Sequence, residues 1–119
     1  MSESLVHHTY VKMIYNKALS IISNDESCFL KADLFECEKP NMTYDSFIPD
    51  VMYCHNNVLI IGEAKTIDDF KTDHSYRQFE AYFKELSKFR GDAYFIACVP
   101  WQISVTARNH FVNLKNKFE

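Results

Sequence analysis

The chain has 119 residues with a net charge of −3, and 47% of its residues are hydrophobic. This length and composition predict one packed domain over residues 1–119 and exclude a disordered chain. The negative charge argues against tight binding to nucleic acid without sequence preference. No apolar run approaches the roughly 20 residues of a membrane span, and no secretion signal is visible at the start.

Four cysteines are scattered through the sequence without a C-x-x-C pair: Cys28, Cys37, Cys54 and Cys98. Disulfides or a metal site are alternatives that the cysteine count leaves open. Reduced thiols are the preferred interpretation, which predicts a cytoplasmic protein. Because no membrane span is predicted, no membrane partner is expected.

Four elements are predicted in the first half of the chain: a helix over residues 3–22, a strand over 28–37, and strands over 47–55 and 58–65. In the helix, Val6, Tyr10 and Ile14 recur at helical spacing. The last two strands are rich in Val, Ile, Leu and Tyr, and Asn56-Asn57 between them tolerates the positive φ angles of a tight hairpin turn. A polar loop is expected at 38–45.

The second half of the chain predicts a helix over residues 74–90, a strand over 93–99 and a helix over 101–118. Phe79 and Phe83 lie on one face of the first of these helices, and Gly91 is placed to end it. The strand is apolar throughout, which predicts a central position with both faces buried. The order is therefore helix, three strands, helix, strand, helix, which is an α/β arrangement.

The predicted hairpin brings three charged side chains together. With Asn56-Asn57 as the two turn residues, Asp50 faces Glu63 across the hairpin, and Lys65 points to the same side. Two neighbouring carboxylates repel each other unless a positive group lies between them. Mg²⁺ is a natural occupant because it binds one or two carboxylates and keeps several waters. The alternative is a salt bridge between Lys65 and one of the two acids.

These residues resemble the PD-(D/E)XK nuclease superfamily, through Pro49-Asp50 and the later Glu63-Ala64-Lys65. Gln78 and Tyr82 form a Q-x-x-x-Y pattern on the next helix, which is similar to the motif of RecB-type members. The order of elements along the chain also resembles the common core of this family. The resemblance implies a restriction endonuclease-like fold, with a three-layer α/β/α core around a mixed sheet of about four strands.

The resemblance also implies a Mg²⁺- or Mn²⁺-dependent nuclease that hydrolyses phosphodiester bonds, with DNA as the expected substrate. Asp50, Glu63 and the carbonyl group of Ala64 would bind one or two metal ions. Lys65 would position the attacking water and stabilise the charge that develops on the phosphate. No residue suggests a covalent intermediate or an organic cofactor.

Five further residues are implied around this centre. Gln78 and Tyr82 are four residues apart, so they share a helical face, and they would touch the nucleic-acid backbone. On the first helix, Glu3 or His7 would reach the metal, and the alternative is that both are ordinary surface residues. Arg77 is expected to contact a phosphate, with a solvated helix face as the alternative.

Two other function classes stay open. A non-catalytic nucleic-acid-binding module could keep this fold, and a small subunit could depend on a partner protein for target recognition. A two-fold homodimer is also expected, because cutting both strands of a duplex needs two active sites.

Overall fold

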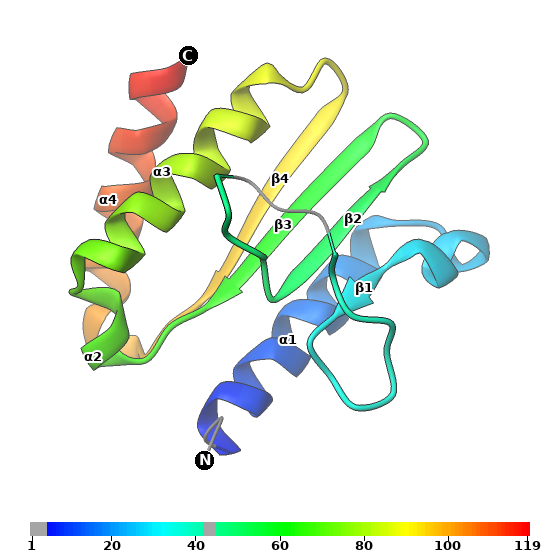
Figure 1. The fold of residues 1–119 in the computed structure, drawn as a ribbon, viewed down its shortest axis with the longest axis horizontal. Helices are drawn as coiled ribbons and strands as arrows, with labels where there is room; N and C mark the ends of the chain where they lie inside the picture. Colours follow the sequence, from blue (N-terminus) through cyan, green and yellow to red (C-terminus); the bar gives the residue numbers. More distant parts are fainter. Residues whose placement is uncertain (1–4, 42–44) are drawn as a thin grey trace.

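In the computed structural model, residues 5–41 and 45–119 are described, and they form a mixed α/β arrangement (Figure 1). The helices are α1 (Leu5–Ile21), α2 (Ile67–Phe70), α3 (Asp73–Lys88) and α4 (Ser104–Phe118), with 3₁₀ helices η1 (Asn24–Phe29) and η2 (Trp101–Ile103). The strands are β1 (Lys31–Ala32), β2 (Val51–His55), β3 (Val58–Ala64) and β4 (Asp92–Cys98). Within the described ranges, no helix has the length and apolarity needed to cross a membrane.

The sheet is mixed, with β2 and β3 in its interior. Its four strands lie in the order β1-β2-β3-β4, and all neighbours are antiparallel except β3 and β4, which are parallel. The predicted hairpin register is confirmed, because His55 pairs with Val58 and Val51 pairs with Gly62. Asn56 and Asn57 form the turn with φ angles of 52° and 64°, the left-handed values that a two-residue hairpin turn favours.

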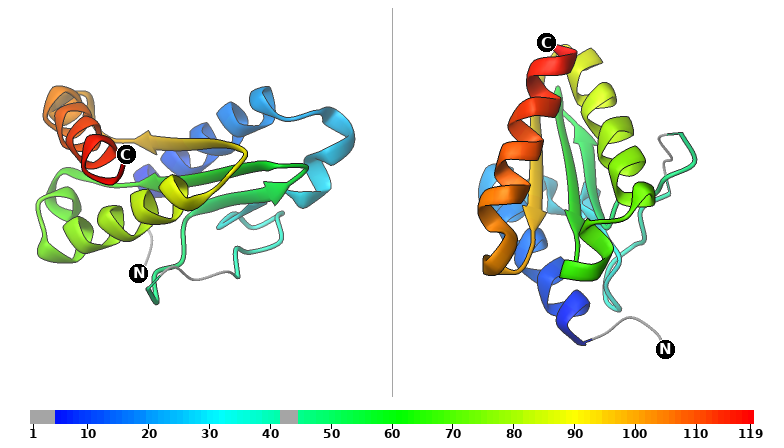
Figure 2. Two further views of the ribbon diagram at one scale, coloured as in Figure 1. Left: turned by 90° about the horizontal axis from the view of Figure 1, so that it is seen from above. Right: turned by 90° about the vertical axis from the view of Figure 1, so that its left-hand side faces the viewer.

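Helices cover both faces of the sheet (Figure 2). On one face, Val11 and Ile14 of α1 share a core cluster with Ile60 of β3. On the other face, Ile61 of β3 shares a cluster with Tyr82 of α3. Since neighbouring residues of a strand point to opposite faces, β3 is buried between the two helices.

The last helix, α4, packs alongside α3 through aromatic side chains. The ring of Phe111 in α4 lies 5.0 Å from that of Phe79 in α3 and 5.0 Å from that of Phe95 in β4, measured between centroids. Leu114 and Ala107 of α4 are buried in the same cluster. This packing holds α4 against both α3 and β4.

The predicted strand over residues 28–37 is wrong for most of its length. Residues 24–29 form η1, and only β1 pairs with β2. Beyond β1, the N–H group of Cys37 donates a hydrogen bond to the carbonyl oxygen of Leu34 at 3.2 Å, which closes a turn. Leu34 is buried in the cluster that contains α1, so this apolar segment fills the core from a turn and not from a strand.

The prediction that residues 93–99 form a central strand is also wrong. Among the described strands, β4 pairs only with β3 and lies at the edge of the sheet, where Asp92 and Tyr94 are exposed. Phe95 packs in the cluster with α3 and α4, and Ile96 packs against the cluster with α1. Helices that cover both faces of a strand require an apolar sequence there. This holds for an edge strand as well as for a central one, so the apolar sequence does not show which of the two β4 is.

Gly91 does not end α3 as predicted, since α3 ends at Lys88 with Phe89 in an extended conformation. The glycine instead permits a close approach, because a Cβ atom there would overlap the carbonyl oxygen and the side chain of Asn57. The same carbonyl oxygen accepts a hydrogen bond from the N–H group of Asp92 at 3.0 Å. The start of β4 therefore rests on the hairpin turn.

Asn57→Gly should leave the free energy of unfolding unchanged or raise it, since glycine adopts a φ of 64° without steric cost. Asn57→Ala should lower it by about 1 kcal/mol, because a β-carbon disfavours the left-handed region. Urea unfolding followed by circular dichroism measures both variants. Equal stability of the two variants would contradict the turn assignment.

Candidate active site

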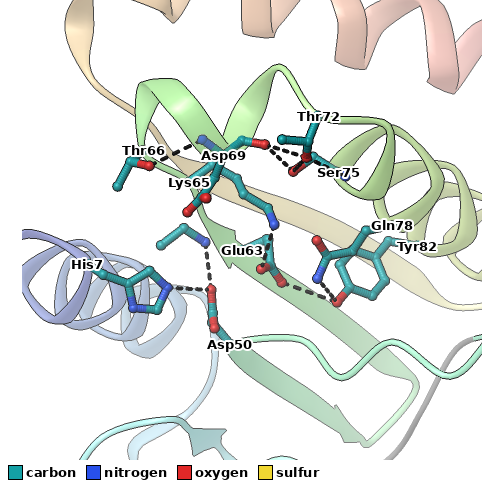
Figure 3. A network of polar contacts seen from close by, with 11 residues as sticks. His7, Asp50, Glu63, Lys65, Thr66, Asp69, Thr72, Ser75, Gln78 and Tyr82 are labelled. Atoms are coloured by element: carbon teal, nitrogen blue, oxygen red, sulfur yellow. Dashed lines mark hydrogen bonds and ion pairs between the residues drawn. The ribbon is translucent and has the colours of Figure 1, made fainter. Parts of the chain in front are cut away.

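Three charged side chains converge where β3 ends and where the chain enters β2 (Figure 3). Asp50 directly precedes β2, Glu63 lies near the end of β3, and Lys65 directly follows it. The strand predicted from residue 47 begins only at Val51. The hairpin register nevertheless directs Asp50 toward Glu63, close enough for its carboxylate to affect the pKa of that residue.

The carboxylate of Asp50 bridges α1 and β3. Its Oδ2 accepts a hydrogen bond from the N–H group of Ala64 at 2.9 Å and lies 3.4 Å from Nε2 of His7. His7 is thus the first-helix candidate that the structure brings to the centre, whereas Glu3 lies outside the described residues. Both contacts fix the orientation of the Asp50 side chain.

Glu63 is the most deeply buried acid of the centre. Lys65 Nζ lies 3.7 Å from its Oε2, and the hydroxyl of Tyr82 donates a hydrogen bond to its Oε1 at 3.2 Å. Glu63 is only 4% exposed and Lys65 only 7%. Burial, followed by the carboxylate of Asp50, raises the pKa of Glu63 well above its usual range, although Lys65 and Tyr82 act in the opposite direction. One ammonium group therefore does not offset two acids in these surroundings.

A chain of hydrogen bonds runs from α3 to Glu63. Nε2 of Gln78 donates to the hydroxyl oxygen of Tyr82 at 3.0 Å, and that hydroxyl donates to Glu63. Burial, and then the charge of Glu63, raise the pKa of Tyr82, so its hydroxyl keeps its proton and remains a donor. Oε1 of Gln78 is buried and accepts no hydrogen bond from any described residue. It is an acceptor suited to a donor on a bound ligand.

Two threonine caps, which the sequence-based prediction missed, direct the chain from β3 to α3. Oγ1 of Thr66 accepts from the N–H group of Asp69 at 3.3 Å and starts α2. Oγ1 of Thr72 accepts from the N–H group of Ser75 at 3.1 Å and starts α3. The hydroxyls of Thr72 and Ser75 also donate to the carbonyl oxygen of Asp69, at 2.8 Å and 2.5 Å. The spacings Thr-x-x-Asp and Thr-x-x-Ser are the sequence signal that indicates both helix starts.

Arg77 lies outside this cluster of acids. It is exposed on the outer side of α3, next in the chain to the buried Gln78. There it lines a surface groove together with Lys84 and Lys117. Its predicted contact with a phosphate therefore concerns this groove and not the acid pair.

The residues of the centre fit a divalent cation of the Mg²⁺ type. Among the described residues, no group of three or more His, Cys, Asp or Glu side chains is arranged to hold a metal. Mg²⁺ needs fewer protein ligands, because it binds through one or two carboxylates and keeps several waters. Asp50 and Glu63 supply that pair, and burial followed by the carboxylate of Asp50 raises the pKa of Glu63 although Lys65 lies beside it. Ala64 is small and buried between Glu63 and Lys65, so its side chain does not crowd the backbone there.

With a chelator present, raising the pH from about 5 to about 8 should lower the thermal stability through Glu63. A group whose pKa is raised by folding stabilises the folded state below its ordinary pKa, roughly 4.3 for glutamate. That contribution is lost as the pH rises through the raised value. Asp50→Asn removes the second cause of the raised pKa, so this variant should lose less stability over the range and should melt at or above the wild type at about pH 8.

Glu36→Gln is the control for these melting experiments, because it removes one negative charge at an exposed position. Mg²⁺ or Mn²⁺ should raise the melting temperature of the wild type by mass action, and should raise that of Asp50→Asn much less. If Asp50→Asn melts clearly below the wild type in chelator at every pH, Asp50 is a structural ion-pair partner and not a metal ligand.

In comparisons with protein-family models, with curated proteins and with solved structures, nothing matches this chain. The interpretation of the centre therefore rests on its own contacts. These are the bonds that join Asp50 to His7 and Ala64, and those that join Glu63 to Lys65 and Tyr82.

Proposed function

We propose that the chain is a metal-dependent nuclease of the PD-(D/E)XK type, which hydrolyses phosphodiester bonds in DNA. The observation that carries the proposal is the convergence of Asp50, Glu63 and Lys65 in one buried centre, with Tyr82 hydrogen-bonded to Glu63. Two acids and one lysine in poorly solvated surroundings are unfavourable for stability. A local cost of this kind is typical of a functional site.

The order of elements adds support to the proposed fold family. A helix, three strands, a helix, a strand and a helix follow one another as α1, β1, β2, β3, α3, β4 and α4, with the short α2 inserted before α3. The sheet is mixed and four-stranded. Both features agree with what the sequence resemblance implies.

Asp50, Glu63 and the carbonyl group of Ala64 would hold Mg²⁺ or Mn²⁺. When bound, the ion supplies positive charge beside the phosphate and lowers the pKa of a water molecule. The N–H group of Ala64 and the ring of His7 already orient Asp50, and Tyr82 already orients Glu63. Because both carboxylates are fixed beforehand, little side-chain freedom remains to be lost on binding.

Lys65 would position the attacking water and stabilise the charge that develops on the phosphate. Its ammonium group lies near Glu63 and over the ring of Phe79, 6.0 Å from the ring centroid. The ring limits the hydration of the ammonium group on that side, which strengthens its electrostatic effect. Gln78 and Tyr82 would orient the substrate, and Oε1 of Gln78 would accept a hydrogen bond from a donor such as a water molecule held by the ion.

Asp50→Asn, Glu63→Gln and Lys65→Met should each lower cleavage of DNA at least about 100-fold in Mg²⁺ or Mn²⁺, because the three groups act as one unit. These replacements preserve side-chain volume, and circular dichroism checks that each variant is folded. Glu36→Gln, which changes an exposed side chain outside the centre, should cleave like the wild type.

The substrates for this assay are supercoiled, linear and single-stranded DNA, with RNA of the same sequence beside them. Cleavage near the wild-type rate by any one variant would remove that residue from the catalytic assignment. If the wild type cleaves none of the substrates, the nuclease proposal fails, and a non-catalytic binding module or a subunit that requires a partner protein replaces it.

A two-fold homodimer is proposed for duplex substrates, because one such centre cuts one strand. Light scattering should give about twice the monomer mass of 14.0 kDa, with duplex DNA present if not without it. A monomer under both conditions at high protein concentration would contradict this arrangement.

A further inference from the structure

We propose that a groove on the outer side of α3 binds one single strand of nucleic acid and leads it to the Asp50–Glu63 centre. The inference rests on the proposed function for the identity of the ligand, but its residues and its test are separate from cleavage. The groove has a volume of about 530 Å³. Its walls come from the segment before β2, from α3 and from the end of α4.

The charge of the groove is opposite to that of the chain as a whole. Arg77, Lys84 and Lys117 line it, and the acids Asp45 and Glu80 leave one net positive charge, in a chain whose net charge is −3. Glu80 is paired with Lys117. Positive charge gathered in one groove of an acidic protein indicates an anionic ligand.

Of the three cations that line the groove, Arg77 and Lys84 are the more available to such a ligand, because Lys117 is paired with Glu80. Both are exposed on α3, seven residues apart, which places them on one face of the helix, two turns from each other. The side chain of neither forms an ion pair or a hydrogen bond with any residue in the described ranges. Both can therefore contact phosphates of one strand.

Two aromatic rings complete the chemistry that a single strand requires. Phe47 lines the groove from the segment before β2, and Phe118 lines it from the end of α4. Both are only partly buried, so part of each ring remains accessible within the groove. Unpaired bases stack on such rings while basic side chains follow the backbone, and this combination is characteristic of single-strand binding. A duplex is too broad to enter a space of this size, so a strand of a duplex would lie there only after it separates from its complement.

The groove and the acid centre share two walls, the segment before β2 and α3. The segment that carries Phe47 continues directly into Asp50, and it contacts α3, since the rings of Phe47 and His74 lie 5.2 Å apart between centroids. On α3, the groove residue Arg77 is followed at once by Gln78, whose amide points to the centre (Figure 3). The two sites are therefore neighbours along both elements, and we expect a strand in the groove to reach the centre.

The test measures binding without cleavage. Fluorescence anisotropy in chelator follows labelled oligo-dT of about 12 nucleotides, oligo-U of equal length and a duplex of mixed sequence. Arg77→Glu/Lys84→Glu should weaken single-strand binding at least about tenfold and should reduce its salt dependence. Lys12→Glu/Lys17→Glu, which makes the same charge change on exposed positions of α1, should weaken it less than about twofold. The two oligonucleotides show whether the groove prefers DNA or RNA.

The aromatic part of the inference has its own variants. Phe118→Ala should weaken single-strand binding. Phe118→Trp should bind like the wild type, because the larger ring keeps the stacking surface. Circular dichroism checks that both variants are folded. Equal binding by the alanine and tryptophan variants would remove stacking from the proposal.

Three outcomes would overturn the groove. The first is that the wild type shows no measurable binding of the single strand. The second is that it binds the duplex more tightly than the single strand. The third is that the α3 and α1 charge variants lose equal amounts of single-strand affinity. The result is independent of the nuclease assignment. If the α3 variant loses binding and no substrate is cleaved, the groove stands and the nuclease proposal fails. If cleavage occurs while the α3 variant binds like the wild type, the nuclease proposal stands and the groove fails.

Discussion

Burying the carboxyl group of Glu63 beside that of Asp50 is the constraint on which the rest of the centre depends. Each acid is costly to remove from water, and each makes the other more costly. The protein offsets part of this cost with Lys65 and Tyr82 on Glu63, and with His7 and the N–H group of Ala64 on Asp50. The raised pKa of Glu63 shows that the offset is incomplete. The centre thus keeps an excess of negative charge that lowers the stability of the protein, which indicates a role other than stabilising the core.

The relative position of Asp50 and Glu63 is determined by the turn at the other end of the hairpin. Asn56 and Asn57 hold left-handed φ angles and fix the pairing of β2 with β3. A slip of one residue would turn Asp50 and Glu63 to opposite faces of the sheet. The turn is also the support on which Gly91 and the start of β4 rest. One short turn therefore determines both the register of the acids and the position of the neighbouring strand.

What the sequence predicts well here is local. The hairpin register follows from two asparagines between apolar runs, and the contact between Gln78 and Tyr82 follows from their spacing on a helix. What it predicts poorly depends on neighbours that are distant in the chain. The apolar sequence of β4 follows from the helices α1, α3 and α4 that cover its faces, and it does not indicate whether the strand lies at the edge of the sheet. The space that Gly91 leaves for Asn57 is likewise invisible without the fold.

The acid centre and the basic groove place opposite demands on a polyanionic ligand. Before a cation binds, Asp50 and Glu63 repel phosphate, whereas the cations of the groove attract it. A cation at the centre reverses the local sign and removes that repulsion, so each ligand should increase the affinity of the chain for the other. The two proposals, metal at the acids and a single strand along α3, are therefore thermodynamically linked. The segment from Phe47 to Asp50, together with α3, is the physical connection, because it forms a wall of both sites.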